Sequence, residues 1–206
     1  MEHILKYFPE LTELQRSQYA QMEQLYPEWN AKINVISRRD IDNLEVNHIL
    51  HSLSLVKFVQ FVPGTRVLDL GAGGGFPSMP LAVYYPQVHF HLVDRVGKKL
   101  RVAQDVAQQL GLENVTVQHG DVKEVKGHFD FVVSRAVMDL GDMVPLVKRL
   151  IDGEDRNAVP NGLICLKGGD LSAEVAKYKN QVLIDELSSY FKEDFFKTKK
   201  ILYLPF

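Results

Sequence analysis

The sequence predicts an α/β protein with a doubly wound, mainly parallel sheet and an N-terminal helical extension. From residue 63 onward, short apolar segments typical of strands alternate with amphipathic segments typical of helices. The first of these strands runs into a glycine-rich loop and then a helix, the order of the ligand-binding turn in such folds. Ligands of doubly wound sheets bind beyond the carboxyl ends of the strands, so we expect the functional site at that edge.

Length and composition limit the protein to one α/β domain. The chain has 206 residues, and we expect residues 1–62 to form the extension and residues 63–206 the sheet-containing body of a single compact unit. No apolar run approaches the roughly 18 residues of a membrane span, and the charged N-terminus shows no signal-peptide core. A lone cysteine, Cys165, agrees with a reducing compartment, so we expect a cytoplasmic protein.

The pattern of apolar residues predicts the elements in order. Strands are predicted at 66–70, 88–93, 115–119, 129–134, 163–167 and 201–204. Helices are predicted at 12–29, 41–61, 78–85, 98–110, 143–151 and 173–188. Thr12 and Gln15 have the spacing of a capping box, and Gly111 is a normal residue after a helix end.

The loop after the first strand is the strongest functional signal in the chain. Gly71, Gly73 and Gly75 permit a tight turn and the close approach of a ligand. Pro77 suits the first turn of the helix at 78–85, whose free N–H groups and positive dipole end predict an anionic ligand group there.

The loop differs from a dinucleotide-binding fingerprint at Phe76, where such a fingerprint has glycine or alanine so that a pyrophosphate can sit on the helix. A bulky ring followed by proline favours a ligand without a pyrophosphate, such as S-adenosylmethionine with its single carboxylate. Asp94, which ends the second strand, is placed to accept hydrogen bonds from ribose hydroxyls of either cofactor. Asp121 follows the third strand, where an adenine edge would be read, and is equally consistent with a helix N-cap.

Several reactions are disfavoured by what the chain lacks. The glycines are not followed by the lysine and hydroxyl of a nucleoside triphosphatase loop. Cys165 lies in the middle of a strand, where an inert buried thiol is expected rather than the nucleophile of pyrimidine methylation. Methylation of a ring nitrogen such as guanine N7 releases no proton, so alignment alone can suffice. Arg135, at the end of the fourth strand, is the candidate pocket residue.

Nucleic-acid contacts would have to come from local basic clusters, because the net charge is −2. Each cluster alone is also explained by a solvated surface. The candidates for contacts with RNA phosphates are Arg38, Arg39, Lys98, Lys99, Arg101 and Lys167. His48 and His51 have no third ligand nearby in the sequence, so no metal site is expected.

Specific motifs run through almost the whole chain, namely WNAKIN, NHILHSL, GAGGGFPSMPLA, LVDRVGKK, FDFVVSRAV and LKG. With these motifs the chain resembles the RsmG (GidB) family of bacterial ribosomal RNA methyltransferases. The resemblance implies a Rossmann-like class I S-adenosylmethionine-dependent fold. It also implies methylation of N7 of one guanine in 16S rRNA of the small ribosomal subunit.

By position, the family's cofactor-binding sites match Gly71, Phe76, Val122, Lys123 and Arg135. The chain departs from the family's usual pattern at Asn47, His51 and the stretch 121–123. We expect a monomer whose partner is 16S rRNA or the small subunit. A nicotinamide-dependent oxidoreductase and a non-catalytic ribosome assembly factor are the competing interpretations.

Overall fold

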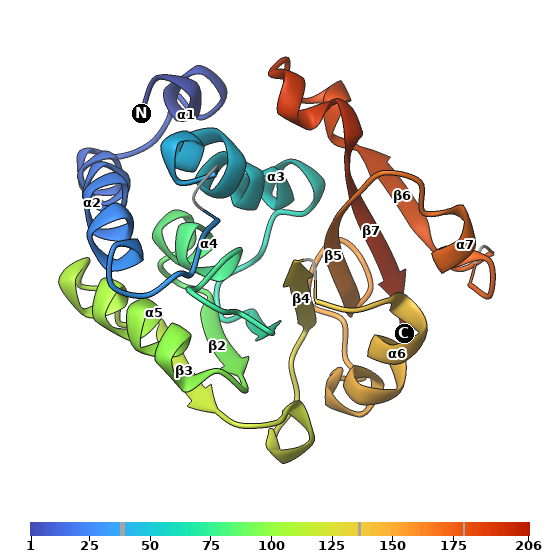
Figure 1. The fold of residues 1–206 in the computed structure, drawn as a ribbon. Helices are drawn as coiled ribbons and strands as arrows, with labels where there is room; N and C mark the ends of the chain where they lie inside the picture. The colour runs from blue at the N-terminus through green and yellow to red at the C-terminus, as the bar shows by residue number, and fades with distance from the viewer. Residues whose placement is uncertain (38–39, 136, 179) are drawn as a thin grey trace.

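A seven-stranded sheet forms the centre of the protein, with the strand order β3-β2-β1-β4-β5-β7-β6 (Figure 1). The computed structural model describes residues 1–37, 40–135, 137–178 and 180–206. Strands β1 to β5 are parallel, and β7 is antiparallel to both of its neighbours. The strands are β1 (Arg66–Leu70), β2 (His89–Asp94), β3 (Val115–His119), β4 (Phe131–Arg135), β5 (Gly162–Gly168), β6 (Leu183–Glu186) and β7 (Lys199–Pro205).

This topology confirms the predicted fold and all six predicted strands. The chain leaves β1 toward β2 and β3 and later returns on the other side through β4 and β5, so the winding direction changes between β1 and β4. In an open α/β sheet, a crevice forms beyond the carboxyl ends of the strands at such a switch point. The loops after β1 and β4 therefore meet at one edge.

Helices cover the sheet, and the helices α1 to α3 precede its first strand in the chain (Figure 1). The α-helices are α1 (Glu2–Tyr7), α2 (Glu13–Asn30), α3 (His51–Phe58), α4 (Ser78–Tyr84), α5 (Gly97–Gln109), α6 (Leu140–Val147) and α7 (Ser172–Val175). Shorter turns are η1 (Ile41–Asn43), the π-helical η2 (Glu45–Leu50), η3 (Val122–Glu124), η4 (Lys148–Leu150), η5 (Leu187–Ser189) and η6 (Asp194–Thr198). Among the described residues, no helix is long and apolar enough to cross a membrane.

Local sequence signals set the ends of the two longest helices. Thr12 Oγ1 accepts from the Gln15 N–H at 3.2 Å and the Gln15 side chain accepts from the Thr12 N–H at 3.0 Å, which is the predicted capping box of α2. Gly111 follows α5 with φ of 65°, the left-handed conformation that glycine adopts without strain. The α1 helix was not predicted, and it packs into the same core through Ile4.

The predicted helix at 41–61 is only partly correct. The segment consists of η1, η2 and α3 in succession, and it becomes extended at Val59, with φ of −140° and ψ of 133°. Val59 and Phe61 are both buried, so the chain places alternate residues in the core as a strand would. At the wider η2 turn, the carbonyl of Asn47 accepts from Arg135 Nη1 at 3.4 Å, which ties this turn to the end of β4.

The predicted helices in the C-terminal half needed two corrections. The helix expected at 143–151 begins earlier, at Leu140, after Asp139 in extended conformation. It continues at its C-terminal end as the 3-10 helix η4. The helix expected at 173–188 is wrong: α7 is a single short helix, and β6 follows it at the sheet edge. The β6 side chains are largely exposed, so backbone pairing with β7 rather than an apolar pattern makes this segment a strand.

One apolar core joins the N-terminal helices to the sheet. Residues of α1, α2 and α3 belong to the same buried cluster as α4, α5 and the faces of β1 and β2. Tyr26 of α2 is fully buried, and its hydroxyl donates to the carbonyl of Gly74 at 2.7 Å. The extension is therefore bonded directly to the glycine-rich loop.

We predict that Tyr26→Phe lowers the free energy of unfolding by about 1–3 kcal/mol, because the buried Gly74 carbonyl loses its donor. Tyr178→Phe is a control, since the partly buried Tyr178 side chain makes no hydroxyl hydrogen bond within the described ranges. Urea denaturation would measure both. Equal stability of the two variants would contradict the structural role of the Tyr26 hydroxyl.

Candidate functional site at the carboxyl edge of the sheet

The first cavity at this edge lies beyond the ends of β1, β2 and β3 and has a volume of about 310 Å³. Its walls include Leu70, Gly71, Val93, Asp94, Val96, Lys99, Gly120, Val122, Val137 and Met138. Of the residues predicted to bind a cofactor, the structure brings Gly71, Asp94 and Val122 into one cavity wall. The predicted RNA contact Lys99 lines it too.

The glycine-rich loop approaches this cavity closely because its residues have no side chains there. Gly71 has φ of 70°, and a Cβ atom on it would lie only 2.6 Å from Cγ2 of Val137. Gly73 donates its N–H to Asp94 Oδ2 at 2.8 Å, while the other Asp94 oxygen accepts from the Val96 N–H at 2.7 Å. Asp94 therefore holds the loop and the start of α5 in place at the cavity rim.

The start of α4 does not present a free anion site as predicted. The Ser78 N–H donates to Asp69 Oδ2 at 3.1 Å, so the chain's own carboxylate occupies that position. Asp69 is fully buried, its Oδ1 atom has no partner among the described residues, and burial raises its pKa to about 6. The N–H groups of Gly71 and Ala72 are also taken, both by the carbonyl of Val93.

Phe76 does not line the first cavity but is buried in the core. Its ring is buried, packs against Tyr26 at 4.6 Å between ring centroids, and lies 5.2 Å from the Arg135 guanidinium. It therefore links the α2 helix to the end of β4.

Asp121 is the N-cap of η3, one of the two roles that the sequence left open. Its Oδ1 atom accepts from the Lys123 N–H at 2.9 Å, and its other oxygen pairs with Arg95. The Lys123 N–H is consequently used within the protein, while the neighbouring Val122 reaches the cavity wall. The first cavity thus contains Val122 but neither the Asp121 nor the Lys123 side chain.

A second cavity, of about 470 Å³, lies beyond the ends of β4 and β5. Its lining consists of Asp40, Asn47, His48, His51, Arg135, Leu166, Lys167, Gly168, Phe195 and Lys199. The two cavities are neighbours along the chain, because Arg135 lines the second and Val137 and Met138 line the first. The candidate pocket residue Arg135 therefore lines the second cavity, two residues before Val137 in the lining of the first.

Arg135 is held from several sides. Its Nη2 lies 2.9 Å from His48 Nδ1 and its Nη1 donates to the Asn47 carbonyl, while the guanidinium lies over the Phe76 ring. Burial lowers the pKa of Arg135 to about 10, which leaves it a cation at neutral pH. Burial and the nearby Arg135 charge lower the pKa of His48 to about 3, and burial likewise lowers the pKa of His51. Both histidines are therefore neutral at pH 7.

The predicted RNA contacts are distributed unevenly. Lys99 lines the first cavity, and Lys98 and Arg101 are exposed on the same helix, α5. Lys167 is instead engaged internally, since its Nζ lies 2.7 Å from Glu174 Oε1 and donates to the Met138 carbonyl at 2.7 Å. Arg38 and Arg39 lie outside the described residues.

Sequence reasoning missed Phe195 of the second cavity, and it gave Lys199 only as part of a basic cluster at 197–200 that could contact RNA phosphates. The Lys199 ammonium lies 4.6 Å from the centroid of the Phe195 ring. These residues come from η6 and β7, far along the chain from Arg135, and only the antiparallel pairing of β7 with β5 brings them to this edge. The basic pair at 199–200, with which β7 begins, was the available signal.

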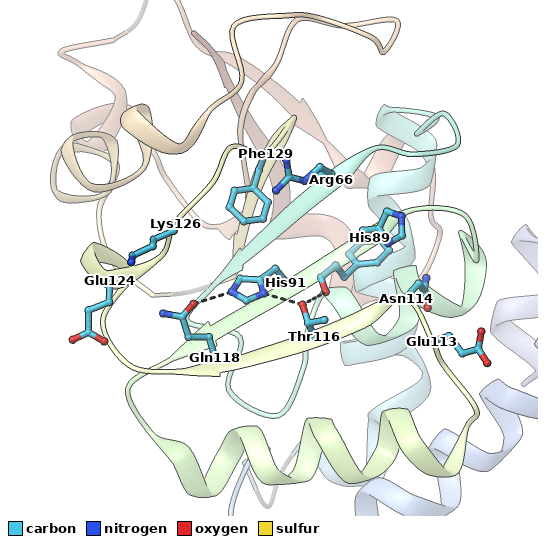
Figure 2. Close-up of a pocket in the computed structure, with 11 residues that line it drawn as sticks. Arg66, His89, His91, Glu113, Asn114, Thr116, Gln118, Glu124, Lys126 and Phe129 are labelled. Atoms are coloured by element: carbon cyan, nitrogen blue, oxygen red, sulfur yellow. Dashed lines mark hydrogen bonds between the residues drawn. The ribbon is translucent and has the colours of Figure 1, made fainter.

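Another hollow, of about 350 Å³, lies on the sheet face beside η3 and is drawn in Figure 2. The ring nitrogens of His91 bond to Thr116 Oγ1 at 2.8 Å and to Gln118 Oε1 at 3.1 Å, and its ring stacks on Phe129. The polar atoms of His91 are thus satisfied. None of the residues predicted to form the site lines this hollow.

The buried Asp69 predicts a pH dependence of stability. Because its pKa is higher in the folded than in the unfolded state, the native state is relatively more stable below pH 4 and loses this contribution as the pH rises through 6. The unfolding free energy of Asp69→Asn minus that of the wild type should therefore increase by about 2–3 kcal/mol between pH 4 and pH 7. Urea titrations across this range would measure it, and a pH-independent difference would contradict the assignment.

Comparisons of the sequence and of the fold with known proteins identify related proteins. A family profile described as rRNA small subunit methyltransferase G matches residues 15–202. The curated "Ribosomal RNA small subunit methyltransferase G" of Bacteroides thetaiotaomicron is 57% identical over 203 residues, which is 98% of each chain. The protein of the same name from Porphyromonas gingivalis is 55% identical over 205 residues, covering 99% of this chain and 93% of that protein.

A solved structure, that of magnesium protoporphyrin IX methyltransferase from Synechocystis PCC 6803 with bound S-adenosylmethionine, has a TM-score of 0.63. It is 19% identical, and the alignment covers 88% of this chain and 91% of that one. At this identity the likeness establishes the fold, which is the Rossmann-like class I methyltransferase fold predicted from the sequence. The family profile and the two relatives extend over nearly the full chain, and the protein therefore belongs to the rRNA small subunit methyltransferase G family.

Proposed function

We propose that this protein transfers the methyl group of S-adenosylmethionine to N7 of a guanine in the 16S rRNA of the small ribosomal subunit. The observation that carries the proposal is the pair of neighbouring cavities at the carboxyl edge, with Arg135 in the wall of one and Val137 in the wall of the other. A methyl donor in the first cavity and a base in the second would face each other across this segment. Family membership supports the substrate.

The first cavity suits S-adenosylmethionine better than a dinucleotide. The N–H groups of Gly71, Ala72 and Gly73 that would cradle a pyrophosphate already bond to Val93 and Asp94. The two oxygens of Asp94 each accept one hydrogen bond and retain capacity for another, which fits two ribose hydroxyls. This satisfied loop disfavours the oxidoreductase interpretation.

Among the residues proposed to bind the cofactor, two roles can be separated. Gly71, Asp94 and Val122 line the first cavity and would contact the cofactor directly. Gly73, Phe76, Asp121, Lys123 and Arg135 would act indirectly, because they bond to or pack against the segments that carry the lining residues. We further propose that residues 1–62 serve as an extension of the 63–206 body that supports the loop through Tyr26.

The chemistry of the second cavity fits an acceptor that releases no proton. S-adenosylmethionine supplies an electrophilic methyl group on a sulfonium when bound. The low pKa of His48 makes that histidine a poor general base, and burial raises the pKa of the Cys165 thiol to about 12, so it is not an effective nucleophile at neutral pH. The side chains would instead exclude water and orient the base toward the donor, which can contribute several kcal/mol.

Positive charge at the second cavity suits an RNA substrate. Arg135, Lys167 and Lys199 line it, with Lys167 paired to Glu174. We propose that Lys199 contacts the backbone of the target nucleotide and that Lys98, Lys99 and Arg101, together with Arg38 and Arg39, contact phosphates farther along the rRNA. A monomeric, cytoplasmic enzyme remains our prediction.

The decisive assay combines the protein, labelled S-adenosylmethionine and small subunits from a strain that lacks the modification. We expect label in 16S rRNA and a single N7-methylguanine, mapped by reduction and aniline cleavage. Cofactor binding without incorporation would overturn the substrate assignment alone. If the protein neither binds the cofactor nor incorporates label, the result would favour a ribosome assembly factor.

A glycine pair tests the cofactor cavity. We predict that Gly71→Ala weakens S-adenosylmethionine binding at least tenfold, or about 1.4 kcal/mol, because its Cβ would collide with Val137 in the cavity wall. Gly111→Ala is the control: its φ of 65° imposes the same left-handed strain, but nothing lies within 4 Å of the added carbon. Calorimetric titration would measure both, and equal affinities would place the cofactor elsewhere.

A further inference from the structure

The described residues around His48 satisfy only one of its two ring nitrogens with a hydrogen bond. It comes from η2, is only 8% exposed, and lines the second cavity. Its ring packs edge-on against Phe76, with 5.2 Å between centroids. One ring nitrogen, Nδ1, lies 2.9 Å from Arg135 Nη2, whereas Nε2 has no hydrogen-bond partner among the described residues.

The contact with Arg135 determines which ring nitrogen of His48 carries the proton. A guanidinium has only donors, so Nδ1 must accept from Nη2 with its lone pair. Burial and the Arg135 charge lower the pKa of His48 to about 3, so the ring carries a single proton at neutral pH. That proton must therefore be on Nε2.

Nε2–H is then a buried donor without a partner among the described residues, on a side chain that lines a cavity of about 470 Å³. An unsatisfied buried donor is costly to a folded protein, and such a group is commonly kept where an occupant supplies the acceptor. The occupant must present an acceptor at this wall, while its methylated atom points toward the first cavity.

We propose that His48 is the residue that recognises the target base as guanine, by donating its Nε2–H to the O6 carbonyl. This inference rests on the proposed function. The major-groove edge of guanine has two acceptors, N7 and O6, and N7 must keep its lone pair free for the methyl group. Adenine has an amino group in place of O6, which would set a donor against the His48 donor. Arg135 is then a positioning residue that fixes the tautomer of His48.

The test compares two bases at the target position of reconstituted small subunits. One 16S rRNA carries guanosine there and the other carries 2-aminopurine riboside, which retains N7 but lacks O6. For each enzyme the ratio of the two kcat/KM values is measured. The ratio is internal to each preparation, so a fraction of unfolded protein cancels.

Two substitutions separate recognition from positioning. His48→Asn provides an acceptor near the Nδ1 position for Arg135 but no donor at the Nε2 position. His48→Gln reaches the Nε2 position with an amide N–H. We expect His48→Asn to reduce the preference for guanosine at least tenfold relative to wild type, and His48→Gln to retain it within about threefold.

The opposite pattern, with the preference intact in His48→Asn and lost in His48→Gln, would overturn the proposal and leave His48 as a support for Arg135. A wild-type enzyme that forms no N7-methylguanine would instead refute the proposed function. A measurement independent of activity is the ¹⁵N spectrum of the histidine rings in the free protein. A proton on Nδ1 of His48, or on both nitrogens at neutral pH, would also overturn the proposal.

Discussion

The cation of Arg135 is the constraint on which the carboxyl edge of the sheet depends. A guanidinium placed at the end of a buried strand loses most of its hydration and must be compensated by its surroundings. The compensation comes from Nδ1 of His48, the carbonyl of Asn47 and the face of Phe76, with the buried Asp69 nearby as opposite charge. These groups belong to η2, to the glycine-rich loop and to β1, so one charge joins the N-terminal segment to the loop and to the second cavity.

The same charge also sets the chemistry that the site can perform. It helps to keep His48 neutral, which removes the nearest histidine from general-base catalysis. Methyl transfer to a ring nitrogen needs no such base, and a site made of oriented donors and a closely approaching backbone is sufficient for it.

The N-terminal helices contribute to the site even though they lie outside the sheet. Tyr26 bonds to the Gly74 carbonyl, Phe76 packs on Tyr26, and η2 supplies His48 and Asn47 to the second cavity. The described lining of the first cavity comes from residues 70–146, which all belong to the sheet-containing body. The second cavity requires the extension on one side and the β7 end on the other.

Local periodicity and glycine spacing along the chain were enough to predict the parallel sheet, the glycine-rich loop and the strand-end positions of Asp94 and Arg135. The sequence also predicted the family, because each family motif is a short unbroken stretch of residues. It failed for β6, since a strand held at a sheet edge by backbone pairing has no apolar pattern of its own. It could not show that Asp69 occupies the start of α4, that Lys167 is paired with Glu174, or that His48 is bonded to Arg135. Each of these contacts joins residues that are separated along the chain by at least one turn or loop. Which polar groups find partners within the protein, and which remain for a ligand, therefore depends on how the chain folds in three dimensions.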